Sequence, residues 1–201
     1  MKIFKSNRKS ILGFKRVILP YSVFSSINED DDISEMEQEY TSKDTSINKS
    51  KLPAIFKLVN FQPNTINLDY GGGKFDNASE YLAEQDVLNL IYDPFNRSTE
   101  HNNNVISEIR NNGGADTATC SNVLNVIKER EVRLNILKNI SKLVKPGGVV
   151  YITVYEGSGD GNEGATKSGY QLNRKTKDYL DEISEIFENV TRKGKLIIAK
   201  N

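Results

Sequence analysis

The chain has 201 residues, enough for one domain with an appendage, and its 27 basic residues are balanced by 27 acidic residues. This balance excludes nucleic-acid binding through bulk charge alone. The single cysteine, Cys120, excludes an intrachain disulfide framework and a cysteine-rich zinc site, and the single histidine, His101, argues against a histidine-based metal centre, so we expect no metal. No apolar run approaches the ~18–20 residues that span a bilayer, and no signal peptide is recognisable, so we expect a cytoplasmic protein.

The first fifty residues differ in charge from the rest of the chain. Residues 1–16 carry six basic side chains and no acidic one, whereas residues 29–44 carry eight acidic side chains and one lysine. Such opposed charge runs are typical of a solvated segment. We therefore expect a charged, partly ordered N-terminal arm at residues 1–51 and a separate domain at residues 52–201. Apolar residues within the arm would let it dock on the domain, either as a passive arm or as a lid or substrate-recruiting tail.

From residue 52 onward, short apolar runs alternate with amphipathic stretches. The apolar runs predict strands at residues 65–70, 87–92, 115–123, 149–155 and 195–199. The amphipathic stretches predict helices at residues 77–85, 128–144 and 179–187. Residues 99–111 are expected to form a short helix at best, and residues 156–169 a glycine-rich loop. Strands that alternate with helices predict an α/β fold with a mostly parallel sheet covered by helices on both faces.

Polar clusters follow the predicted strands where a parallel sheet binds its ligands, beyond the carboxyl ends of the strands. These clusters lie at residues 69–76, 92–97, 121–125 and 155–161. Gly71, Gly72 and Gly73 after the first strand allow a ligand to approach the backbone closely. Asp93, which follows Asp69 by 24 residues, can accept hydrogen bonds from both hydroxyls of a ribose. The sequence therefore predicts a site for a cofactor that contains a nucleoside.

Four pieces of the sequence occur in an order shared with a known family: residues 66–74 (INLDYGGGK), Asp93, residues 115–127 with their ending NVLNVI, and residues 143–148 (LVKPGG). Over residues 52–201 the chain resembles class I S-adenosylmethionine-dependent methyltransferases, and it is similar to small methyltransferase-like proteins of phages and mobile elements. The resemblance implies a Rossmann-like sheet, S-adenosylmethionine as cofactor and methyl transfer to an acceptor. It also implies the cofactor-binding residues, with Asp69, Gly71, Gly72 and Gly73 at the methionine portion, Asp93 at the ribose, and Cys120, Ser121 and Asn122 along the sulfonium side.

The sequence departs from the family pattern in two places. Phe75 replaces the third glycine of the family's loop, so the loop must turn differently. Only 22 residues separate Asp93 from Ala115, so we expect the sheet to be reduced between the second and fourth family strands. The family's adenine contacts therefore cannot be carried over, although a tyrosine, proline or phenylalanine within residues 92–95 could supply an apolar wall.

Methyl transfer from a sulfonium is an in-line displacement, in which the protein aligns the nucleophile with the methyl group. A base is needed only for a protonated nucleophile, and Glu156, with Tyr155 beside it, is the best-placed candidate unless it is a solvated loop acid. His101 is either a base or an exposed loop histidine, and Cys120 is most simply a small buried strand residue. We expect the substrate to be recognised by Gln171, Asn173 and Arg174. The alternative is that these three residues belong to a helix cap and a surface turn.

The sequence identifies neither the methyl acceptor nor the oligomeric state. Residues 121–124 lack the Pro-Pro motif of amino-methylating DNA enzymes, and no Pro-Cys nucleophile of cytosine-modifying enzymes is present, so a small molecule, a nucleic acid and a protein all remain open. One alternative function is a non-catalytic cofactor- or partner-binding protein on the same fold. Another is an NAD-dependent oxidoreductase, which is disfavoured because Asp76 stands where the dinucleotide fingerprint requires a glycine.

Overall fold

The structure is a computed structural model that describes residues 33–41, 43 and 51–201. The basic run at residues 1–16 and the other expectations for the chain before residue 33 lie outside the described residues. The described part of the chain contains no helix with the length and apolarity needed to cross a membrane. The compact unit extends over Ile33–Asn201.

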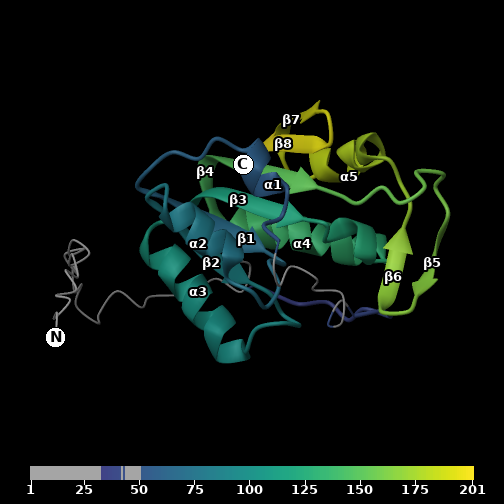
Figure 1. The fold of residues 1–201 in the computed structure, drawn as a ribbon, viewed down its shortest axis with the longest axis horizontal. Coiled ribbons are helices and arrows are strands. Elements are labelled where there is room, and N and C mark those ends of the chain that lie inside the picture. The colour runs from purple at the N-terminus through teal and green to yellow at the C-terminus, as the bar shows by residue number, and fades with distance from the viewer. Residues whose placement is uncertain (1–32, 42, 44–50) are drawn as a thin grey trace, which may run out of the picture. The chain divides into compact units, whose positions relative to one another are not determined.

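A six-stranded sheet in the order β2-β1-β3-β4-β8-β7 organises this unit (Figure 1). Its strands are β1 (Thr65–Tyr70), β2 (Val87–Tyr92), β3 (Ala115–Ser121), β4 (Val144–Thr153), β7 (Glu188–Lys193) and β8 (Leu196–Lys200). Strands β1 to β4 run parallel to one another, and β8 is antiparallel to both of its neighbours. The prediction of a mostly parallel α/β sheet is confirmed.

Helices cover both faces of this sheet. They are α1 (Ile55–Leu58), α2 (Asn77–Ala83), α3 (Thr99–Asn111), α4 (Arg130–Leu143) and α5 (Leu180–Ser184). One hydrophobic cluster joins α1 and α2 to Val87 and Leu196, and the other joins α3, α4 and α5 to Leu68 and Ile197. Because Leu196 and Ile197 are neighbours in one strand, these clusters lie on opposite faces.

The segment between β2 and β3 is a single helix. This helix connects β2 to β3, which pairs with β1 on the side opposite β2, so β2 is the edge strand of the sheet. The expected reduction of the sheet between the second and fourth family strands is confirmed. The expectation of a short helix at best is wrong, because α3 has 13 residues. Ser98 accepts a hydrogen bond from the backbone of His101, and Val105 and Ile109 bury one face. The His101 ring is half-buried in α3, 2.8 Å from the Ile91 carbonyl oxygen, and is no exposed loop histidine.

Three further elements differ from the sequence expectations. Strands β5 (Glu163–Thr166) and β6 (Gly169–Leu172) form a hairpin where residues 156–169 were expected to be a loop, and Figure 1 shows it apart from the large sheet. Strand β7 was not predicted, because all but one of its residues are exposed and give no apolar signal. Strand β4 begins at Val144, directly after α4, and its pairing with β3 is irregular between Ala115 and Thr117.

Candidate functional site

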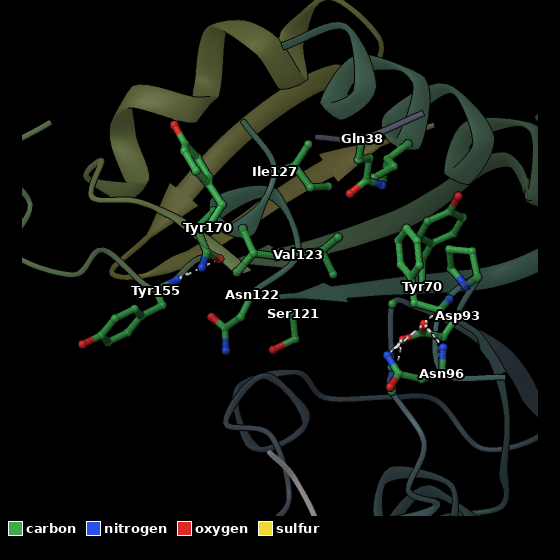
Figure 2. Close-up of a pocket in the computed structure, with 18 of the residues that line it drawn as sticks. Gln38, Tyr70, Asp93, Asn96, Ser121, Asn122, Val123, Ile127, Tyr155 and Tyr170 are labelled. Carbon is green, nitrogen blue, oxygen red and sulfur yellow. Dashed lines mark hydrogen bonds between the residues drawn. The ribbon is translucent and has the colours of Figure 1, made fainter. Parts of the chain in front are cut away.

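A cavity of about 370 Å³ lies at the carboxyl ends of β1, β2, β3 and β4, where the sequence predicts the ligand site (Figure 2). Its size falls within the ~300–1,000 Å³ of small-molecule pockets. The loops after these strands line it, together with residues 33–41, which we call the strap. Within the described chain, its lining includes two carboxylates, Glu35 and Asp93, and no lysine, arginine or histidine.

The three glycines after β1 form a backbone cradle, and Gly71 and Gly72 have no room for a side chain. A Cβ atom on Gly71 would lie 2.5 Å from Val123 Cγ2, and one on Gly72 would lie 2.3 Å from Asp69 Oδ2. Gly71 also has a φ of +75°, which favours glycine. Its N–H donates to the Tyr92 carbonyl oxygen at 2.7 Å and fixes the loop against β2. A ligand in the cavity therefore meets backbone at these glycines, beside the side chains of the loop that follows β2.

Asp93 ties the loop after β2 to this glycine cradle. Its carboxylate accepts hydrogen bonds from the backbone N–H groups of Gly73 at 2.8 Å, Phe95 at 3.0 Å and Asn96 at 2.9 Å. Arg97 adds a second tie, because its Nε donates to the Gly73 carbonyl oxygen at 2.8 Å. Asp93 lines the cavity, although only 4% of its surface is exposed. The structure thus places Asp93 in the cavity wall, where it orders the two loops, and its contact with a ribose stays a prediction.

Asp69 lies beneath the cradle and does not line the cavity. Thr119 Oγ1 donates to its carboxylate at 3.0 Å, within a buried polar row that continues through Asn67 and Asn89. Burial raises the pKa of Asp69 to about 7 against the hydrogen bond from Thr119, which lowers it. Asp69 thus lies against Gly72 from below, and its predicted contact with the methionine portion of a cofactor stays a prediction.

The opposite end of the cavity is formed by residues after β3 and β4 and by β6. Figure 2 shows Ser121, Asn122 and Tyr155 at this end, away from Asp93. Asn125 Oδ1 accepts from the Tyr155 N–H at 3.3 Å, and Gln171 Nε2 donates to the Tyr155 carbonyl oxygen at 3.1 Å. These bonds fix the backbone of Tyr155, whose side chain is 63% exposed.

Besides Asp69, four residues predicted for the site do not line the cavity. Cys120 is fully buried in β3, and burial raises the pKa of its thiol. Asn173 turns toward Gly157, while Arg174 binds Glu182 at 2.7 Å.

Glu156 is the fourth, and the structure does not support it as a general base. Its carboxylate accepts from the backbone N–H and the hydroxyl of Thr176, both at 2.8 Å, and Lys195 lies 3.4 Å away. The hydrogen bonds from Thr176 lower the pKa of Glu156 to about 2, so it is a weak proton acceptor near neutral pH.

The strap contributes cavity residues that the sequence did not point to. Glu35 and Gln38 line the cavity, and Figure 2 shows Gln38 on the side away from Asn96. The acidic run around Glu35 predicted only a solvated segment. A run of like charges does not indicate which of its acidic side chains contacts a buried partner.

The comparisons with known proteins agree with this geometry. A family model described as a methyltransferase domain matches residues 40–189. Because this match covers most of the chain, the protein belongs to the methyltransferase domain family, and the resemblance based on the motifs is confirmed. A phage or mobile-element origin stays a prediction. A search of curated proteins found no match to this chain.

Solved structures show the same fold at low sequence identity. The 1,6-didemethyltoxoflavin-N1-methyltransferase of Burkholderia thailandensis, solved with 1,6-didemethyltoxoflavin and S-adenosylhomocysteine, is 16% identical, with a TM-score of 0.51 over 70% of this chain and 72% of that one. PigF, solved with SAH, is 17% identical, with a TM-score of 0.51 over 74% of this chain and 54% of that one. The aligned region thus spans between about half and three quarters of these proteins.

Proposed function

We propose that the cavity binds S-adenosylmethionine and that the protein transfers its methyl group to an acceptor. The observation that carries this proposal is the side-chain-free cradle Gly71–Gly73, held by the carboxylate of Asp93 at the neighbouring strand end. Membership of the methyltransferase domain family supports the same chemistry.

The residues at the cradle end fit the parts of this cofactor. The backbone of Gly71–Gly73 would hold the methionine portion, and Asp93 would accept from the ribose hydroxyls. Pro94 and Phe95 line the cavity beside Asp93 and offer an apolar surface for adenine. Among the described residues, the lining has two carboxylates and no basic side chain, which suits a ligand with net positive charge.

The cofactor supplies an electrophilic methyl group, so the protein must orient the acceptor and exclude water. Ser121, Asn122, Tyr155 and Gln171 line the end opposite the cradle and would face the acceptor. With Glu156 turned to Thr176, these neutral side chains would act by orientation and hydrogen bonding. Such an arrangement suits an acceptor whose nucleophile needs no strong base.

Calorimetric titration with S-adenosylhomocysteine, with NAD as a parallel control, tests the cofactor assignment. We expect micromolar binding of S-adenosylhomocysteine alone. Asp93→Ala should abolish this binding, because it removes the ribose acceptor and loosens both loops, whereas Asp181→Ala, at an exposed position of α5, should leave the affinity unchanged.

An unchanged affinity in Asp93→Ala would refute the ribose assignment. Binding of the cofactor without transfer of a radiolabelled methyl group to any component of the native cell extract would favour a non-catalytic binding protein.

A further inference from the structure

The strap is fixed to the domain on both sides of the residues that line the cavity. Before them, the Ser34 carbonyl oxygen accepts from the amides of Asn135 at 2.7 Å and Asn139 at 2.8 Å, both in α4. After them, the Glu39 N–H donates to Glu129 at 3.0 Å. The Tyr40 ring also stacks on Tyr170 of β6, with the ring centroids 5.5 Å apart. Glu35 and Gln38 are therefore held as part of the cavity wall.

Two tyrosines orient the carboxylate of Glu35. Its Oε1 accepts from the hydroxyl of Tyr92 at 2.6 Å and from that of Tyr70 at 3.2 Å. Both rings are buried at the ends of β2 and β1, with their centroids 4.8 Å apart. No hydrogen bond from a described residue reaches the second oxygen, Oε2. This arrangement leaves one carboxylate oxygen of a cavity residue without a donor among the residues that the structure describes.

The negative charge of the cavity indicates which kind of ligand group Oε2 of Glu35 would attract. Glu35 and Asp93 both line it, and the nearest arginine of the adjoining loop, Arg97, is paired with Asp76 at 2.8 Å outside the lining. Asp93 is already engaged by three backbone N–H groups. Glu35, an exposed residue of the strap, therefore carries the less compensated negative charge toward a bound ligand.

We propose that Glu35 makes the cavity selective for a cationic cofactor over its uncharged product. This inference rests on the proposed function. S-adenosylmethionine carries a net charge of about +1 near neutral pH, whereas S-adenosylhomocysteine is close to neutral. In the transfer, the bond from sulfur to the methyl carbon breaks, its electron pair stays on sulfur, and a bond forms between the acceptor and the methyl carbon. The cation that Glu35 attracts thereby disappears, so the product is held less tightly than the substrate.

Calorimetry at about pH 8 with S-adenosylmethionine, S-adenosylhomocysteine and sinefungin tests this selectivity, because sinefungin carries an ammonium in place of the sulfonium. Although Glu35 is an exposed residue, desolvation of its carboxylate raises its pKa, so this pH ensures the ionised form. We expect the wild type to prefer both cations, and Glu35→Gln to weaken both by about three- to tenfold while S-adenosylhomocysteine changes by less than about twofold.

Two further variants separate charge at this position from structure. Glu37→Gln removes the same charge from an exposed residue of the strap that does not line the cavity, so all three affinities should stay unchanged. Tyr92→Phe removes the shorter of the two hydrogen bonds to Glu35. It should reduce the preference for the two cationic ligands over S-adenosylhomocysteine, by a smaller factor than Glu35→Gln does.

An equal loss for all three ligands in Glu35→Gln, or no change for any, would overturn the inference, as would a wild type without preference for the cations. If the wild type binds none of the three, the proposed function fails as well. If it binds all three and Glu35→Gln leaves their ratio unchanged, the selectivity alone fails.

Discussion

The two ends of the cavity are built in opposite ways. At the cradle end, the polar groups are already bound within the protein, since the carboxylate of Asp93 accepts from three backbone N–H groups. At the other end, no hydrogen bond from a described residue reaches the side-chain amide of Asn122 or the hydroxyl of Tyr155. A preformed end suits a ligand that is the same in every reaction cycle, and an end with free polar groups suits the acceptor that differs between family members.

The end near Tyr155 is nevertheless supported from behind by buried charges. Arg133 makes a two-pronged contact with Glu182, at 2.8 Å and 2.9 Å, and donates to the carbonyl oxygens of Ile127 and Lys128. Ile127 lines the cavity, so this ion pair fixes part of its wall. The free side chains at this end therefore rest on a rigid support.

The largest expected effect follows from breaking that support. Glu182→Ala leaves the buried guanidinium of Arg133 without its partner and should lower the free energy of unfolding by about 3–5 kcal/mol. Glu185→Ala removes one of the two acidic partners of Arg130, in a pair whose side chains are about half exposed, and should cost less than about 1 kcal/mol. Urea unfolding of both variants measures the difference. Equal losses of unfolding free energy in the two variants would show that the pair of Glu182 stabilises the fold no more than a surface ion pair does.

The next effect concerns the cradle end and its pH dependence. The pKa of Asp69 is about 7 in the folded protein and near 3.8 when unfolded, so between these values the folded state binds more protons. Stability should therefore fall as the pH rises from about 4 to about 7, by at most about 1.4 kcal/mol per pH unit for this one group.

Asp69→Asn keeps an acceptor for Thr119 and should remove most of that decline. Unfolding in urea at several pH values measures it, with the exposed Asp181→Asn as a control that should retain the wild-type slope. A slope that persists in Asp69→Asn would contradict the assignment of this titration to Asp69.

The smallest effect tests the backbone at the end of the cavity opposite the cradle. Asn122 has a φ of +57°, a left-handed conformation that asparagine tolerates better than most residues. Asn122→Ala should cost about 1 kcal/mol in unfolding free energy, whereas Asn122→Gly should cost less because glycine accepts this conformation. Thermal unfolding of the pair measures the difference, and a variant with alanine as stable as the one with glycine would argue against strain at this position.

The cradle end was predictable from sequence because its signal is local. A buried strand, three glycines and an acid after the next strand occur in order along the chain, and parallel strands bring their carboxyl ends together. The same logic predicted the positions of Ser121, Asn122 and Tyr155. The cofactor and acceptor contacts themselves stay predictions.

The residues that sequence analysis misplaced depend on partners far along the chain. Glu156 follows a strand end as expected, yet its carboxylate turns to Thr176, 20 residues later. Arg174 is drawn to Glu182, which also holds Arg133 from α4. Glu35 accepts hydrogen bonds from tyrosines that lie 35 and 57 residues further along the chain, and no periodicity in an acidic run predicts such a contact. Tertiary contacts of this kind decide where a charged side chain points.

The contact of Glu35 with two phenols also provides an optical signal. The chain has nine tyrosines and no tryptophan, so the emission of the tyrosines is not lost by energy transfer to an indole ring. A phenol that donates to a carboxylate differs in absorbance and emission from one that donates to water. Separation of the strap from Tyr70 and Tyr92 would therefore change the intrinsic ultraviolet spectrum of the unlabelled protein.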